Sequence, residues 1–234
     1  MMTPVIPDGG INAVIFDCDG VLVDSEVIGM IGARAVLSEF GLDYAEADFV
    51  RRFVGMHDQA FFGALRRDYQ SHWNAPAPED FEARILDGRR RNSHLLKPVP
   101  GAPSALDAAR DQFGALAVAS SSRTEYLQKK LKRTDLFDRV APHIYSADLV
   151  RNGKPAPDIF LHAANAIAQP PSACLVLEDS ENGVRAGVAA GMKVWGFTGG
   201  GHCPPDHGAR LKAAGAIAVA PDFDRFRAML KALS

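Results

Sequence analysis

The sequence predicts an α/β fold, in which an open parallel sheet carries helices on both faces and a helical segment is inserted after the first strand. Short apolar runs recur along the chain, and each is followed by turn residues and then by a segment with helical periodicity. This alternation is typical of strands and helices in a parallel sheet. A long stretch between the first two runs breaks the alternation, which indicates the insertion.

The apolar runs are the predicted strands, and they are apolar enough for both faces of each strand to be buried. We expect strands at residues 12–16, 115–119, 173–177, 193–197 and 216–219. We expect helices at residues 102–112, 123–133, 156–168, 181–190 and 222–232. The strands and most helices together form one predicted core domain, comprising residues 10–24 and 98–234.

Residues 25–97 are predicted to form a separate helical cap domain. Their apolar residues recur at helical spacing, and the residues expected on buried faces are Phe49, Phe53, Phe61, Phe62 and Leu65. The proline-rich segment 75–78 predicts a break between two of the helices.

The overall composition of the 234-residue chain is that of a globular protein, with 47% apolar and 23% charged residues. A net charge of −2 gives no global attraction to nucleic acid or to a membrane surface. The three cysteines lack paired spacing, and neither a signal peptide nor a membrane-spanning run is recognised. We therefore expect a cytoplasmic protein with no nucleic-acid or membrane partner, as a monomer or weak homodimer.

Polar side chains gather where predicted strands end and in one loop before a helix. The set comprises Asp17, Asp19, Ser120, Ser121, Ser122, Lys154, Glu178 and Asp179. Ligands of an open α/β sheet bind beyond the carboxyl ends of its strands. Each element by itself is weak evidence, because a helix cap explains the aspartate pair or Ser120, a solvated loop position explains Lys154, and a cap or surface pair explains Glu178 and Asp179. Gathered together, the carboxylates would repel one another without a cation, and Mg²⁺ prefers such oxygen ligands.

These motifs resemble those of the haloacid dehalogenase superfamily, in the subgroup that contains β-phosphoglucomutase and many small sugar-phosphate phosphatases. The resemblance covers nearly the whole chain. It rests on Asp17-x-Asp19-Gly20-x-Leu22-x-Asp24-Ser25-Glu26, Ala119-Ser120-Ser121-Ser122, Lys154-Pro155-x-Pro157-Asp158-Ile159-Phe160 and Leu177-Glu178-Asp179-Ser180-x-x-Gly183. It implies a Rossmann-like core with a helical cap, Mg²⁺ as cofactor and a small phosphorylated metabolite as substrate.

The resemblance also implies a role for each residue of the set. Asp17 is expected to be the nucleophile that forms an aspartyl-phosphate, and Asp19 the general acid and base. Ser120, Ser121 and Lys154 are expected to bind the phosphoryl group. The expected Mg²⁺ ligands are Asp17, Asp19 through its backbone carbonyl, Glu178 and Asp179.

Differences between this sequence and the motifs of known family members narrow the choice of reaction. Asp19 distinguishes the chain from haloacid dehalogenases proper, which lack the second aspartate. Residues 25–96 contain no lysine, which excludes the cap Schiff base of phosphonoacetaldehyde hydrolases. The cap of β-phosphoglucomutase carries a histidine and an arginine where this chain has Ile28-Gly29-Met30 and Gly55-Met56-His57-Asp58. We therefore favour a phosphatase over a sugar-phosphate mutase, which remains the alternative.

Substrate specificity is expected to depend on the cap and on the loop after the second strand, and the sequence motifs there are less specific than those of the core. The residues expected to contact the leaving group are His57, Arg51 and Ser122. An exposed loop histidine explains His57 equally well. A third hypothesis, a catalytically idle binding protein, is disfavoured because binding alone needs no pair of Asp17 and Asp19.

Overall fold

The computed structural model describes residues 10–53 and 58–233. The chain divides into two compact units. The core unit takes in the described residues up to Asp24, Lys97–Gly200 and the residues from Pro205 onward. The helical unit comprises the described residues of Ser25–Leu96, together with Gly201–Pro204.

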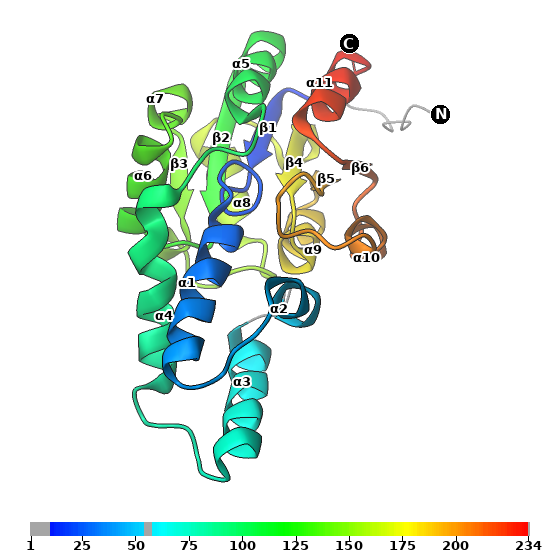
Figure 1. Ribbon diagram of the computed structural model, residues 1–234. Helices are drawn as coiled ribbons and strands as arrows, with labels where there is room; N and C mark the ends of the chain where they lie inside the picture. Colours follow the sequence, from blue (N-terminus) through cyan, green and yellow to red (C-terminus); the bar gives the residue numbers. More distant parts are fainter. Residues whose placement is uncertain (1–9, 54–57, 234) are drawn as a thin grey trace. The chain divides into compact units, whose positions relative to one another are not determined.

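The core unit is built on one sheet of six parallel strands, in the order β3-β2-β1-β4-β5-β6 (Figure 1). The strands are β1 (Ala13–Phe16), β2 (Ala115–Ser120), β3 (Ile144–Ser146), β4 (Cys174–Glu178), β5 (Lys193–Phe197) and β6 (Ala218–Ala220). The order runs outward from β1 in one direction and from β4 in the other, so the topology switches between these two strands. The predicted α/β class with an open parallel sheet is confirmed.

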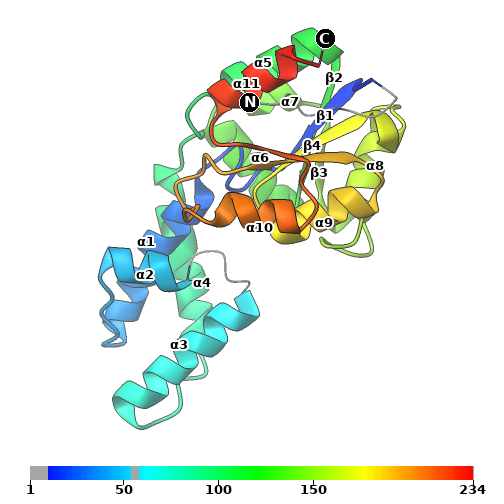
Figure 2. The same cartoon turned by 90° about the vertical axis from the view of Figure 1, so that its right-hand side faces the viewer.

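Helices cover both faces of this sheet (Figure 2). They are α5 (Ala102–Phe113), α6 (Thr124–Arg133), α7 (Phe137–Val140), α8 (Asp158–Ala166), α9 (Glu181–Ala189), α10 (His207–Ala213) and α11 (Phe223–Lys231), with 3₁₀ turns at Ala147–Leu149 and Pro171–Ala173. Successive side chains of a strand point to opposite faces. Ile15 therefore joins the apolar cluster that includes Phe160 of α8 and Val184 of α9, whereas Phe16 packs against Phe226 of α11, with ring centroids 5.6 Å apart.

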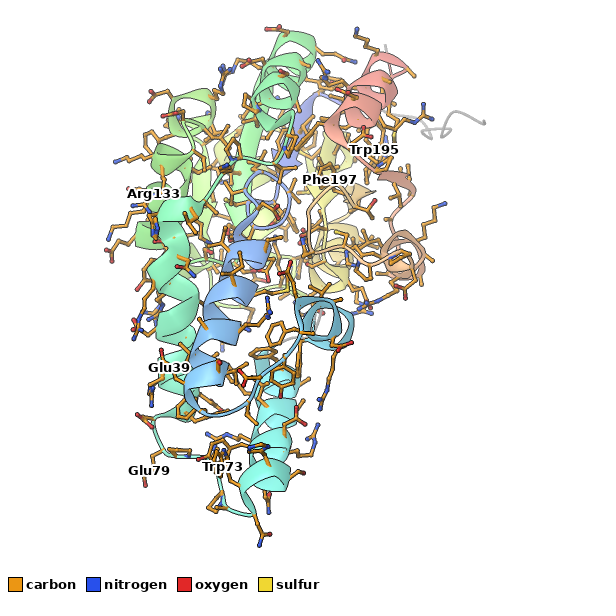
Figure 3. All side chains as sticks on the ribbon, in the orientation of Figure 1. Glu39, Trp73, Glu79, Arg133, Trp195 and Phe197 are labelled. Carbon is orange, nitrogen blue, oxygen red and sulfur yellow. The ribbon has the colours of Figure 1, made fainter. Side chains whose placement is uncertain are left out.

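The aromatic residues of β5 bind α11 to the sheet (Figure 3). Trp195 and Phe197 are both fully buried. Their ring centroids lie 5.9 Å from Phe226 and 4.6 Å from Phe223, respectively. Aromatic pairs at these separations add to the stabilisation that comes from burying their surface. Burial of aromatic surface thus explains why the C-terminal helix packs on this face.

The structure corrects several predicted elements. β3 was not expected from the sequence, because it has three residues and two of them are only half-buried. α10 was not among the helices expected from the sequence. The helix expected at 156–168 spans only Asp158–Ala166, since Pro157 takes the N-cap position. The strand expected at 216–219 is β6, which begins at Ala218.

The helical unit contains α1 (Ser25–Glu39), α2 (Glu46–Phe53), α3 (Asp58–Trp73), α4 (Phe81–Arg91) and a 3₁₀ turn at Asn92–Leu95. The proline-rich segment 75–78 lies between α3 and α4, as predicted. The predicted apolar positions are all buried in one cluster, which includes Phe49, Phe53, Phe61, Phe62 and Leu65. This unit therefore has an apolar core of its own.

Neither a bilayer-spanning helix nor a disulfide occurs among the residues that the structure describes. None of the helices in the described residues combines the length and apolar character that crossing a bilayer requires. Cys18, Cys174 and Cys203 are free thiols, in agreement with their unpaired spacing in the sequence.

Two glycines allow α1 and α4 to cross closely, which generates a first prediction. A Cβ added at Gly32 would lie 2.0 Å from the carbonyl oxygen of Gly88. We expect Gly32→Ala to destabilise the protein by about 1–3 kcal/mol, since overpacking outweighs the better helix propensity of alanine. Thermal unfolding of the variant measures this loss.

The matched control is Gly63→Ala in α3, where a Cβ would meet only the end of the Arg67 side chain at 3.6 Å. This variant should unfold at the wild-type temperature or slightly above it. Equal melting temperatures for Gly32→Ala and wild type would contradict the close crossing.

Candidate active site

A tight turn after β1 holds two aspartates at the end of the sheet. The backbone N–H of Asp17 donates to the carbonyl of Leu177 in β4, at 3.0 Å. Gly20 has a φ of 79°, which glycine adopts without strain, and its N–H donates to the carbonyl of Val23 at 2.8 Å. The chain thus doubles back immediately after Asp19, and both carboxylates remain near the strand end.

The register of the sheet brings the other predicted residues to the same place. Phe16 of β1 lies opposite Val118 of β2 and Leu177 of β4. The residues that follow these positions therefore emerge together at the carboxyl edge of the sheet. Parallel pairing, rather than closeness in the sequence, assembles the site.

Three carboxylates form a buried cluster at this edge. Asp17, Glu178 and Asp179 each place one carboxylate oxygen within 4.8 Å of the others. All three residues are almost completely shielded from solvent. Burial raises the pKa of Asp17 well above its ordinary value, and the neighbouring Glu178 carboxylate raises it further, against the opposing effect of Lys154.

Lys154 partly balances this negative charge. Its ammonium donates to Asp17 Oδ1 at 2.5 Å, to the carbonyl of Ala119 at 3.1 Å and to Glu178 Oε1 at 3.2 Å. The side chain is only 5% exposed. Burial by itself lowers the pKa of Lys154, but the Asp17 and Glu178 carboxylates outweigh burial and raise it, so the lysine remains protonated.

The donor set fits Mg²⁺. Lys154 pairs with Asp17 and Glu178, and the third carboxylate of the cluster, Asp179, adds buried negative charge that a further cation would offset. The cluster offers only oxygen atoms, which are the ligands of a hard divalent cation.

Hydrogen bonds orient Glu178 and Asp179 within the cluster. Glu178 accepts from the Ser180 hydroxyl at 2.9 Å and from the N–H of Asp179 at 2.9 Å. Ser180 also caps α9 by accepting from the N–H of Gly183 at 3.0 Å. The buried ring of His207 donates from Nε2 to the carbonyl of Asp179 at 2.5 Å. Ser180, which caps α9, thus holds the Glu178 carboxylate, and His207, the first residue of α10, holds the backbone of Asp179.

Asp19 occupies a different environment from Asp17. Its carboxylate accepts from the Ser122 hydroxyl at 2.7 Å and from the Ser120 hydroxyl at 3.4 Å, and it forms an ion pair with Lys130. The side chain is 22% exposed, compared with 8% for Asp17. The two aspartates therefore differ in solvation and in partners, as two residues with different chemical roles would.

Sequence reasoning missed Lys130 and His207. Lys130 belongs to a lysine-rich helix, and the sequence alone does not distinguish it from its solvated neighbours. Its spacing of three residues from the buried Leu127 was the one available signal, because residues three apart share a helix face. His207 stood in a glycine- and proline-rich stretch with no helical pattern.

The described contacts of this arrangement do not test three further predicted residues, Ser121, Arg51 and His57. Ser121 is exposed, next to Ser120 and Ser122. Arg51 lies on α2, and its side chain is not among those the structure describes, whereas His57 lies outside the described residues. The adjacent Arg52 is occupied by an ion pair with Asp68 at 2.6 Å. The predicted substrate contacts of the helical segment therefore stay predictions.

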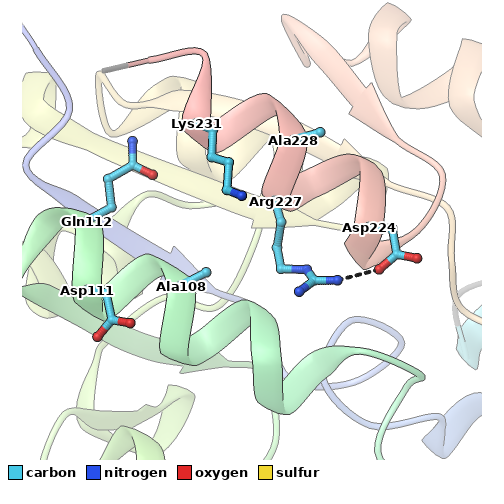
Figure 4. A pocket seen from close by; sticks show the side chains of 7 residues that line it. All are labelled: Ala108, Asp111, Gln112, Asp224, Arg227, Ala228 and Lys231. Atoms are coloured by element: carbon cyan, nitrogen blue, oxygen red, sulfur yellow. Dashed lines mark hydrogen bonds and ion pairs between the residues drawn. The ribbon is translucent and has the colours of Figure 1, made fainter.

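A surface hollow between α5 and α11 contains none of these residues (Figure 4). Its volume is about 610 Å³, and it is lined by Ala108, Asp111, Gln112, Asp224, Arg227, Ala228 and Lys231. Within it, Arg227 pairs with Asp224 at 2.6 Å. The hollow carries charges of both signs, and it lacks the buried carboxylates found at the strand ends.

Comparison with known proteins agrees with the geometry. Residues 11–191 match the family model of haloacid dehalogenase-like hydrolases. The chain belongs to this family. A phosphorylated carbohydrates phosphatase of Thermotoga maritima is 32% identical over 213 residues, which cover 90% of this chain and 95% of the relative.

Solved structures of family members show the same fold. A hydrolase of this family from Deinococcus radiodurans, solved with bound phosphate and sodium, matches with a TM-score of 0.84 and 32% identity, covering 97% of each chain. A Thermotoga maritima protein provisionally described as a β-phosphoglucomutase matches with a TM-score of 0.77 and 31% identity, covering 96% of this chain and all of that one. The predicted enzyme class, a phosphoric monoester hydrolase of this family, is confirmed.

Close packing of Glu178 against α9 generates a second prediction. A Cβ added at Gly183 would lie 1.3 Å from Glu178 Oε1. Gly183→Ala should displace the Glu178 carboxylate from Lys154 and lower phosphatase kcat/KM by at least about 10-fold, because small misplacements in an active site are costly. Steady-state kinetics measure the loss.

Gly208→Ala is the control, since its Cβ would make an ordinary contact with Val219 at 3.5 Å. This variant should retain wild-type kcat/KM. Full activity in Gly183→Ala would show that the position of Glu178 does not matter for turnover.

Proposed function

We propose that this hydrolase is an Mg²⁺-dependent phosphatase of small phosphorylated metabolites, with sugar phosphates as the substrate class, and that it acts through an aspartyl-phosphate on Asp17. The observation that carries the proposal is the ion pair between the buried Asp17 and Lys154, beside the carboxylates of Glu178 and Asp179. The named activity of the Thermotoga maritima relative, a phosphatase of phosphorylated carbohydrates, supports the substrate class.

Asp17 is the nucleophile in this scheme. One of its carboxylate oxygens forms a bond to phosphorus while the bond from phosphorus to the leaving oxygen breaks. An anionic carboxylate and a dianionic phosphate repel each other, and the Lys154 ammonium, 2.5 Å from Asp17, reduces that repulsion. Ser120 and Ser121 bind the phosphoryl oxygens.

Mg²⁺ would be held by Asp17, Glu178, Asp179 and the backbone carbonyl of Asp19, and when bound it supplies positive charge that neutralises the phosphoryl group. The oxygens of Glu178 already accept hydrogen bonds from Lys154, Ser180 and the backbone. A carboxylate has about four lone-pair sites, so Glu178 keeps the capacity to bind a cation as well.

Asp19 moves the proton. It protonates the leaving oxygen as the phosphoryl group departs, and it then takes a proton from the water that hydrolyses the aspartyl-phosphate. Its greater exposure and its separate hydrogen-bond partners support this role beside a more buried nucleophile.

The helical segment, residues 25–97, is proposed to act as the cap of a core made of residues 10–24 and 98–234. In this proposal His57 and Arg51 of the cap and Ser122 of the core contact the leaving group. The relative described as a β-phosphoglucomutase keeps the mutase as the second candidate. A mutase would isomerise a sugar phosphate and require a bisphosphate activator, whereas a phosphatase releases inorganic phosphate without one.

Substitution of the nucleophile tests the reaction. Asp17→Asn should reduce phosphate release from a panel of sugar phosphates by at least about 10³-fold, because an amide cannot form the aspartyl-phosphate. Assays with Mg²⁺ and with EDTA measure the metal requirement in parallel. Turnover retained in Asp17→Asn would remove this residue from its role, and isomerised product in place of phosphate would favour the mutase.

Binding of Mg²⁺ can be tested without activity. A ligand that binds only the folded state raises its stability, by about 2.7 kcal/mol at a concentration 100 times the Kd. The melting temperature of the wild type should therefore rise with added MgCl₂, and Asp179→Asn should lose most of this rise. Asp224→Asn, an exposed carboxylate on α11, is the control and should keep it. Identical shifts in all three proteins would contradict a metal site at Asp179.

A further inference from the structure

Donors hold both oxygens of the Asp19 carboxylate. Lys130 pairs with Oδ1, while Oδ2 accepts from the Ser122 hydroxyl at 2.7 Å and more weakly from the Ser120 hydroxyl at 3.4 Å. A carboxylate held at both oxygens has one preferred orientation. In a proton-transfer residue, that orientation decides which atom can receive the proton.

Lys130 and Ser122 also support each other. The Lys130 ammonium donates to the Ser122 hydroxyl at 3.0 Å, and that hydroxyl donates onward to Asp19. The carbonyl of Ser122 accepts from Ser146 at 2.7 Å, and Ser146 is buried at the end of β3. The three side chains thus close a triangle that is anchored to the neighbouring strand.

The position of Lys130 on α6 explains how it reaches this triangle. Side chains of a helix lean toward its N-terminus, and the N-terminus of α6 adjoins the loop after β2. The adjacent Lys129 is instead 67% exposed and pairs with Glu125 on its own helix. Lys132 lies over the ring of Phe137, 4.8 Å from its centroid. The lysines of α6 therefore have separate environments, and the structure joins Lys130 to the site.

We propose that Lys130 is a positioning residue for Asp19: its ammonium, together with Ser122, holds the general acid and base in the orientation that reaches the leaving oxygen. This role rests on the proposed phosphatase function. A purely stabilising ion pair is the competing explanation. Direct binding of the substrate phosphate by Lys130 is the other competing explanation.

The leaving group separates these explanations. A sugar alkoxide is a poor leaving group and needs protonation by Asp19, whereas p-nitrophenolate leaves without it. The value of kcat/KM covers steps up to release of the leaving group, so it reports this difference. Hydrolysis of the aspartyl-phosphate follows and needs Asp19 as base with either substrate, and kcat includes that step.

The experiment compares Lys130→Met with wild type on p-nitrophenyl phosphate and on the best-cleaved sugar phosphate of the panel. We expect kcat/KM for the sugar phosphate to fall by about 10–100-fold, within the range that general acid catalysis contributes. For p-nitrophenyl phosphate kcat/KM should change by less than about 3-fold, while kcat falls because phosphoenzyme hydrolysis is slowed.

Two variants serve as controls. Lys129→Met removes the same charge from the next residue of α6 and should match wild type with both substrates. Lys130→Arg retains a cation and should recover part of the lost sugar-phosphate activity. A double-mutant cycle with Asp19→Asn should show strong non-additivity, because Lys130 acts through Asp19.

Several outcomes would overturn the role of Lys130. An equal loss of kcat/KM on both substrates would assign Lys130 to phosphate binding. Wild-type kinetics in Lys130→Met, with or without a lower melting temperature, would leave only a structural ion pair. If the wild type released phosphate from neither compound, the proposed function itself would fail, and the role of Lys130 with it.

Discussion

The buried ion pairs of Lys154 are the interaction on which the site depends. Its ammonium lies between Asp17 and Glu178, and all three side chains are removed from water. Burial of unpaired carboxylates costs several kcal/mol each, so without this cation the cluster would be protonated or displaced. The lysine thus offsets part of the cost of keeping Asp17, the proposed nucleophile, ionised inside the protein.

Topology explains why these charges meet. Asp17, Lys154 and Glu178 are far apart in the sequence, and they come together because β1 and β4 are adjacent parallel strands whose carboxyl ends share one edge. The loop that carries Lys154 precedes α8, which packs on the same part of the sheet. Asp17 and Glu178 stand at the ends of apolar strands, and Lys154 lies in the loop before a helix that packs on them, so the apolar core positions the charged site.

Burial on both faces of a strand decides which parts of this fold can be predicted from the sequence. β1, β2, β4 and β5 were predictable because their apolar runs reflect burial on both faces, and residues at their ends were natural candidates for the site. β3 was not, since a short edge strand buries too little surface to leave a pattern. Lys130 was missed because no local sequence pattern marks it. Its contact with Asp19 spans 111 residues, and the side chain is directed toward Asp19 only in the folded protein.

The most direct test of the account is to trap the covalent intermediate. Wild-type protein is incubated with a labelled sugar phosphate and Mg²⁺, quenched in acid, and its peptides are mapped by mass spectrometry. The account predicts a hydroxylamine-sensitive phosphoryl group on the peptide that contains Asp17. Steady turnover with no such group, or with the phosphoryl group on another residue, would contradict it.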